Sequence, residues 1–256
     1  MCVGMFFALT SLAAKGADWV PPENPSPSKI LQEAQQDAQN QNYADALAKH
    51  VWYHENALRI DPAQYGVRLS FALSYWISLG TKYPAAQKRF VEERDEAGKA
   101  VLKGKNSREK FHDYQSMNEC LKEQQKTVDL FLELDKKSPK TATEVYSIAE
   151  PSLIQAKQFE ACGRHLDPDK QLATLTKQYR QAAPKTEADK QKEAFTGYAK
   201  GILANKGATL VALLVVGGKK EKAAEVAASL KQLSDDAEVH QALDDAFEGK
   251  LPLQGS

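Results

Sequence analysis

The chain has 256 residues, of which 42% are hydrophobic and 27% charged, so it can bury a sizeable core and is not disordered as a whole. Its 34 Lys and Arg residues balance its 34 Asp and Glu residues, whereas proteins that bind duplex nucleic acid normally carry a basic excess or stripe. The composition therefore indicates a folded protein that binds no nucleic acid.

The N-terminal segment has the order of features found in secretory signal peptides. An apolar run from Cys2 to Ala14 is followed by small residues and then by a proline-rich segment, although no Lys or Arg precedes the run. The run is shorter than the ~20 residues that span a bilayer. We therefore expect a signal peptide at residues 1–17, ending at Ala17, and a proline-rich linker at residues 18–28. The alternative is that the run is a buried helix of the fold.

A cleaved signal peptide has a consequence for the location of the protein. The mature chain would be exported, either to the periplasm or as a secreted protein, and we expect no transmembrane segment in it.

Most later segments carry apolar residues at helical spacing. Ser26 and Pro27 form a cap and first-turn pair. A second helix starts at Tyr43 and ends at Asp61-Pro62, a pair that also caps the next helix. Pro84 opens a fourth helix, which ends in a loop at residues 103–107.

The second half of the chain is also helical in its pattern. Two apolar groups, at residues 111–121 and 128–134, have no helix breaker between them, so one long helix is possible. Thr141 and Glu144 have the spacing of a capping box, and Pro151 is expected to kink or split the helix that contains it.

The run Ala208–Val216 is apolar on every side, so periodicity alone does not distinguish a buried strand from a buried helix. No other segment has the pattern of a strand that could pair with it, which favours a helix. We therefore predict an all-α chain with a helical domain at residues 29–250, at least four antiparallel helix pairs, and a tail at residues 251–256.

Part of this helical pattern repeats after 40 residues, since Tyr43 and Ala46 align with Tyr83 and Ala86. A small residue lets two antiparallel helices approach closely, and an aromatic residue fills the gap at the turn. These are the packing requirements of a helix-turn-helix repeat.

The same region resembles the tetratricopeptide repeat (TPR) family. Residues of that family's sequence motif occur at Trp76, Leu79, Gly80, Tyr83, Ala86 and Phe90. The resemblance implies a right-handed α-solenoid of antiparallel helix pairs, here with irregular repeats. Tyr83 and Ala86 lie closer together than a regular repeat permits, so Tyr83 is interpreted as the aromatic residue of a turn.

Few residues have a spacing that indicates chemistry. His50 and His54 share one helix face, an arrangement that a metal could use. The pair has no evident third ligand and is interpreted as half-buried histidines of a long helix. The acidic run Val91–Lys99 is interpreted as a solvated helix face. Cys120 and Cys162 either pair or are simply small buried residues. We assign no catalytic, cofactor-binding or metal-binding residue.

An aromatic group stands out in the first half of the chain. Its members are Trp52, Tyr53, Tyr65, Phe71, Tyr75 and Trp76. Core packing explains most of them, and any that remain exposed would be suited to anchor a ligand.

The resulting functional hypothesis is a non-catalytic scaffold whose groove holds an unknown protein or peptide. Candidate residues for the groove are Gln35, Gln39, Arg68 and Tyr75. Two alternatives stay open: an enzyme or metal-binding protein with a site around His50 and His54, and a purely structural protein associated with the cell envelope.

Overall fold

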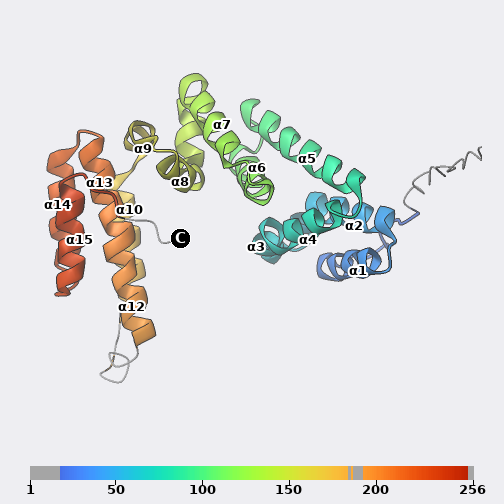
Figure 1. Ribbon diagram of the computed structural model, residues 1–256, viewed down its shortest axis with the longest axis horizontal. Coiled ribbons are helices and arrows are strands. Elements are labelled where there is room, and N and C mark those ends of the chain that lie inside the picture. Colours follow the sequence, from blue (N-terminus) through green and yellow to red (C-terminus); the bar gives the residue numbers. More distant parts are fainter. Residues whose placement is uncertain (1–17, 184–185, 187–192, 253–256) are drawn as a thin grey trace, which may run out of the picture. The chain divides into compact units, whose positions relative to one another are not determined.

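The computed structural model describes residues 18–183, 186 and 193–252 (Figure 1). All regular secondary structure in these residues is helical, which confirms the predicted all-α class. The chain divides into two compact units, Met1–Gln124 and Gln125–Ser256, so the stretch 29–250 that the pattern suggested as one domain contains a boundary. The predicted signal peptide, residues 1–17, lies outside the described residues.

The first unit is a series of helices joined by short turns (Figure 1). In chain order these are α1 (Pro27–Gln39), α2 (Tyr43–Ile60), η1 (Pro62–Gln64), α3 (Tyr65–Leu69), α4 (Phe71–Gly80), α5 (Pro84–Leu102) and α6 (Ser107–Leu121). Helix α1 packs along α2, α4 contacts both α2 and α5, and α5 packs along α6. Neighbours in sequence are thus also neighbours in the packed unit.

The core of this unit forms around Trp76. Its ring meets that of Phe90 edge to face, with centroids 5.4 Å apart, and its indole N–H donates to the Ala86 carbonyl oxygen at 3.0 Å. Met117 from α6 belongs to the same cluster and is fully buried. With Ala46 of α2, the core therefore joins four helices whose apolar faces the sequence pattern indicates separately.

The aligned residues Tyr43 and Tyr83 meet in this core. Their rings are stacked with centroids 6.0 Å apart, and both are half-buried against the Trp76 cluster. Ala46 and Ala86 have no exposed surface, as expected for small residues at a close helix contact.

Two breaks in the helices depart from the sequence pattern. The helix expected after Asp61-Pro62 is divided into η1, α3 and α4, with a distorted backbone at Ser70 (φ −126°, ψ −90°). The apolar groups at residues 111–121 and 128–134 lie in separate helices, because Lys122 adopts a left-handed conformation (φ 59°) and ends α6.

The described residues of the second unit are also largely helical. They are α7 (Gln124–Lys137), α8 (Pro139–Gln155), α9 (Phe159–His165), α10 (Pro168–Ala182), α12 (Glu193–Gly201), η2 (Ile202–Gly207), α13 (Ala208–Val216), α14 (Lys220–Lys231) and α15 (Ala237–Phe247). Helix α13 packs against α9, α14 and α15. The helix predicted for Ala208–Val216 is thereby confirmed as the centre of this unit.

Two details of α8 differ from the sequence expectations, and the state of the two cysteines decides between open alternatives. Pro151 lies inside α8 without splitting it. The expected capping box at Thr141 and Glu144 is not used, because α8 already begins at Pro139 after Ser138. Both Cys120 and Cys162 are free thiols, so the interpretation as separate cysteines holds.

Helices α12, η2 and α13 follow one another without a break, and η2 is a π-helical turn. Residues 197–216 of this run are long and apolar enough to cross a bilayer, but 56% of the most apolar 18-residue window within them is buried inside the fold. The described residues therefore contain no clear transmembrane segment.

The linker expected at residues 18–28 is shorter and less free than predicted. Helix α1 already begins at Pro27, so only residues 18–26 of the expected linker lie outside a helix. We name residues 18–26 the strap. The ring of Trp19 packs against Trp52 of α2 with centroids 6.2 Å apart. The start of the strap is therefore in contact with the helices of the first unit.

Candidate functional site

A buried ionic cluster connects α2, α3 and α6 in the first unit. The guanidinium of Arg68 donates to both carboxylate oxygens of Asp113, at 2.5 Å and 2.9 Å. Arg68 also donates through Nε to the carbonyl oxygen of His54 at 2.7 Å, and through Nη2 to the Nε2 atom of that ring at 3.2 Å. Arg68 is 2% exposed and Asp113 is fully buried.

The surroundings determine the charge of each group in this cluster. Burial and the neighbouring Arg68 lower the pKa of His54 to about 3, so the ring is neutral near pH 7. Burial would raise the pKa of Asp113, but hydrogen bonds from Arg68 and the nearby positive charges outweigh it and hold that pKa below its usual value. The cluster is therefore a carboxylate–guanidinium pair beside a neutral imidazole.

The tautomer of His54 follows from these contacts. Arg68 has donors only, so Nε2 of His54 must accept and its Nδ1 must carry the proton. That Nδ1 atom is buried and has no hydrogen-bond partner in the described part of the chain. Such an unsatisfied donor costs free energy on folding.

Arg68 is consequently not an exposed residue of a groove, as the sequence analysis expected. Its charge is neutralised by a bidentate ion pair with Asp113, which connects α3 to α6. A second buried arginine, Arg94 of α5, donates to Asn118 at 2.8 Å and to Glu123 at 2.5 Å. These two arginines stabilise the packing of α6.

The two histidines of α2 belong to the core. The ring of His50 stacks on Trp76 with centroids 6.2 Å apart, and burial lowers its pKa to about 4. No group of three or more His, Cys, Asp or Glu side chains suited to a metal ion was found in the described residues. The pair therefore fits a packing role.

Three aromatic residues of α3 and α4 in the first unit keep exposed surface. Phe71 is 62% exposed and Tyr65 is 39% exposed, whereas Tyr75 is half-buried against a small cluster that contains Leu31 and Ala72. The Tyr65 hydroxyl lies 2.8 Å from the Nδ1 atom of His112. We name Tyr65, Phe71 and Tyr75 the aromatic face.

The remaining candidates for the groove come from α1. Gln35 is half-buried, and its side chain donates to the Leu31 carbonyl oxygen at 3.4 Å, while Gln39 is exposed at the end of the helix. Helix α1 contacts α4, so Gln35 and Tyr75 lie on adjoining helices. Of the four candidates, Arg68 alone is buried.

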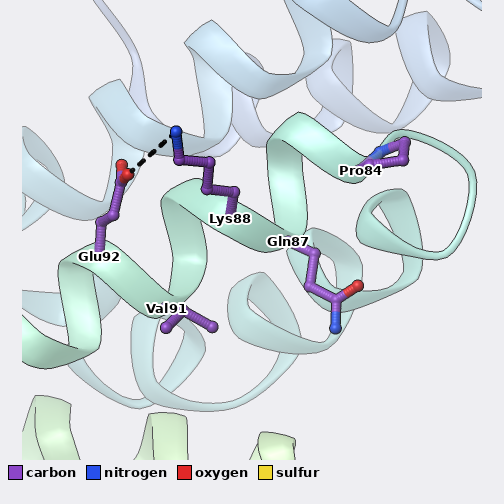
Figure 2. A pocket seen from close by; sticks show the side chains of 5 residues that line it. All are labelled: Pro84, Gln87, Lys88, Val91 and Glu92. Atoms are coloured by element: carbon purple, nitrogen blue, oxygen red, sulfur yellow. Dashed lines mark ion pairs between the residues drawn. The ribbon is translucent and has the colours of Figure 1, made fainter.

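A shallow depression of about 400 Å³ lies on α5 and is shown in Figure 2. The residues that line it are Pro84, Gln87, Lys88, Val91 and Glu92. All five come from one helix, and Lys88 and Glu92 form an ion pair at 3.8 Å (Figure 2). Because no second element contributes a side chain, the depression is a helix surface without convergent polar groups.

The second unit contains a carboxylate–imidazole–hydroxyl chain. His165 Nε2 lies 2.7 Å from Asp135, and its Nδ1 lies 2.8 Å from the Thr143 hydroxyl. That hydroxyl also lies 3.0 Å from the Pro139 carbonyl oxygen one helical turn earlier, and Arg164 donates to Asp135 at 2.5 Å. These bonds join α7, α8 and α9, which is a sufficient structural role for the group.

The comparisons with known proteins identify no relative. No protein-family model, no curated protein and no solved structure matches the chain. The resemblance to the tetratricopeptide family therefore rests on the residues of the sequence alone.

Sequence reasoning singles out all three residues of the aromatic face and misses the buried cluster. Tyr65, Phe71 and Tyr75 were singled out because aromatic residues are concentrated there. Asp113 was overlooked, since it lies 45 residues from Arg68 and no local pattern connects the two. The available signal is the position of Asp113 next to the apolar residues of α6. A carboxylate buried there requires a positively charged partner.

Proposed function

We propose that this protein is a non-catalytic scaffold that binds a protein or peptide through the aromatic face of its first unit. The observation that supports this best is the exposure of Phe71, a residue that is 62% exposed although Ala72 and Leu73, which follow it in α4, are buried. Exposed aromatic rings are frequent anchors of protein interfaces, because they bury a large apolar area on binding.

Further observations support a binding role over a catalytic one. Three buried charged groups of the first unit, Arg68, Asp113 and Arg94, are engaged in ion pairs. The depression on α5 has no convergent polar groups. The short turns and close helix contacts fit the proposed TPR-like solenoid with irregular repeats, in which helix pairs present a long surface to a ligand.

The test is selection of peptides from a displayed random library with the full chain as bait. We expect the selected peptides to contain apolar or aromatic residues and to bind the Phe71→Ser variant at least tenfold more weakly. The matched control is Tyr198→Ser, because Tyr198 is 66% exposed but lies in the second unit. Equal affinities for wild type and Phe71→Ser would refute the proposed face, and a library that yields no binding peptide would favour the purely structural alternative.

Export is the second part of the proposal and rests on the apolar run Cys2 to Ala14. Mass spectrometry of the protein from its native host should find a mature N-terminus near Ala17 or Asp18. An intact N-terminus at Met1 on cytoplasmic protein would contradict export while leaving the binding proposal in place.

A further inference from the structure

The strap starts in a seat formed by one face of α2. The backbone N–H groups of Asp18 and Trp19 both donate to one carboxylate oxygen of Asp45, at 2.8 Å and 3.1 Å. The Trp19 ring meets Trp52 nearly at right angles, with an interplanar angle of 79°. The ammonium of Lys49 lies 5.7 Å from the centroid of the Trp19 ring, within the range of a cation–π contact.

Part of the seat is held by contacts outside the strap. Asp45, Lys49 and Trp52 stand at positions i, i+4 and i+7 and so share one face of α2. Lys49 is only 8% exposed and forms ion pairs with Asp37 and Glu33 of α1. An acceptor, a cation and an aromatic wall are thereby held on rigid helices. We name these three residues the Trp19 seat.

The rest of the strap is held weakly. Val20 is 76% exposed, and residues 20–25 include three prolines. Within the described part of the chain, residues 20–25 take part in no hydrogen bond. Before Ser26, whose carbonyl oxygen accepts from Ile30 at the start of α1, the strap is therefore held chiefly by Asp18 and Trp19.

The chemistry of the seat indicates what else can occupy it. Asp45 accepts two successive backbone N–H groups, which any extended peptide can offer, and the ring between Lys49 and Trp52 gives preference to an aromatic side chain. We propose that the Trp19 seat binds an extended segment of a partner protein that presents an aromatic residue, and that the strap occupies the seat until such a segment displaces it. The seat shares no residue with the aromatic face, although Trp52 and Tyr75 pack against the same small cluster.

The test uses the full chain and a synthetic probe, the N-acetylated peptide of residues 18–26 with a fluorophore at its C-terminus. In the Trp19→Ser variant the chain's own strap lacks its ring, so the seat is free for the probe. We expect saturable binding by fluorescence anisotropy, at least tenfold tighter for Trp19→Ser than for wild type. Circular dichroism establishes that each variant is folded.

Matched variants assign the binding to the seat. Adding Asp45→Ala to the Trp19→Ser chain should weaken binding at least tenfold, and so should the Trp19→Ser change in the probe. Adding Phe71→Ser should leave it unchanged, so failure of this inference is distinguishable from failure of the aromatic face. The inference is overturned if the Trp19→Ser chain does not bind, if wild type binds equally well, or if Asp45→Ala has no effect.

One further result would also overturn it. If the wild-type chain dimerises at high concentration, if Trp19→Ser abolishes the dimer, and if no variant binds the probe, then the seat accepts the strap of a second copy. Light scattering during gel filtration measures this directly.

Discussion

At the scale of single residues, buried polar groups determine which side chains are available. Arg68 and Asp113 are both inside the first unit, and each charge is tolerated because the other is within hydrogen-bond distance. Removal of one partner from such a pair leaves a buried charge uncompensated. The same argument explains why Arg68 is not available to a ligand.

Arg68→Met should therefore lower the free energy of unfolding by about 3–5 kcal/mol, measured by urea denaturation. The double variant Arg68→Met, Asp113→Leu should be closer to wild type, because the orphaned carboxylate is gone. Lys137→Met is the surface control, since its pair with Glu133 is solvent-exposed and worth at most about 1 kcal/mol. A loss below that of the control for Arg68→Met would contradict the buried pair.

The two buried histidines predict a pH dependence of stability. Their pKa values fall from 6.5 to about 4 for His50 and about 3 for His54, so below pH 6.5 the unfolded chain binds more protons than the folded one. The free energy of unfolding then falls as the pH drops from about 6.5 towards 4. Each ring should contribute a loss of roughly 2 kcal/mol at pH 5 relative to pH 7.

Urea midpoints measured at pH 7 and pH 5 check this prediction. His50→Leu should remove about half of the difference, because it removes one of the two titrating rings. A stability that is equal at both pH values would show that the two rings are not buried in the neutral form.

At the scale of the helix pair, close contacts depend on small residues. Ala46 of α2 is fully buried beside the Trp76 cluster, so Ala46→Phe should overpack the contact and cost about 1–3 kcal/mol. Ala85→Phe is the control, because Ala85 is exposed and precedes the buried Ala86. Equal melting temperatures for the two variants would contradict the close packing of these helices.

A second contact between elements involves glycine in the second unit. A Cβ atom added to Gly163 of α9 would lie 3.0 Å from the Cα atom of Gly217, and backbone cannot move aside as a side-chain end can. Gly163→Ala should thus lower the melting temperature. A Cβ atom added to Gly197 of α12 meets nothing within 4 Å, so Gly197→Ala should raise the free energy of unfolding by roughly 0.5–1 kcal/mol. If Gly197→Ala destabilises the protein as much as Gly163→Ala does, the close contact between Gly163 and Gly217 is not the cause of the loss.

At the scale of the whole molecule, the two compact units should unfold separately, because each has its own core. All three tryptophans, Trp19, Trp52 and Trp76, lie in the first unit, so tryptophan fluorescence reports that unit alone while far-UV circular dichroism reports both. We expect Arg68→Met to shift the fluorescence transition and Gly163→Ala to shift only the circular dichroism. If Gly163→Ala also shifts the fluorescence transition, the two units unfold as a single cooperative fold.

Local sequence determined the helices and many of their ends. Apolar spacing predicted α1, α2 and α5, and Asp61 and Asp167 cap the following elements by accepting from Ala63 and Lys170, at 3.0 Å and 3.1 Å. The all-apolar run Ala208–Val216 was correctly predicted as a helix because no strand partner was present. These features depend on interactions within a few residues, which a sequence pattern contains.

Tertiary structure alone decided the burial of Arg68, the docking of Trp19 and the exposure of Phe71. Each depends on residues distant in sequence: Asp113 lies 45 residues from Arg68, and Asp45 lies 26 residues from Trp19. A charged or aromatic side chain is compatible with either a core or a surface, and the choice depends on which partners the packed helices bring within reach. The sequence therefore determined what the helices are, and their packing determined which side chains remain for a partner.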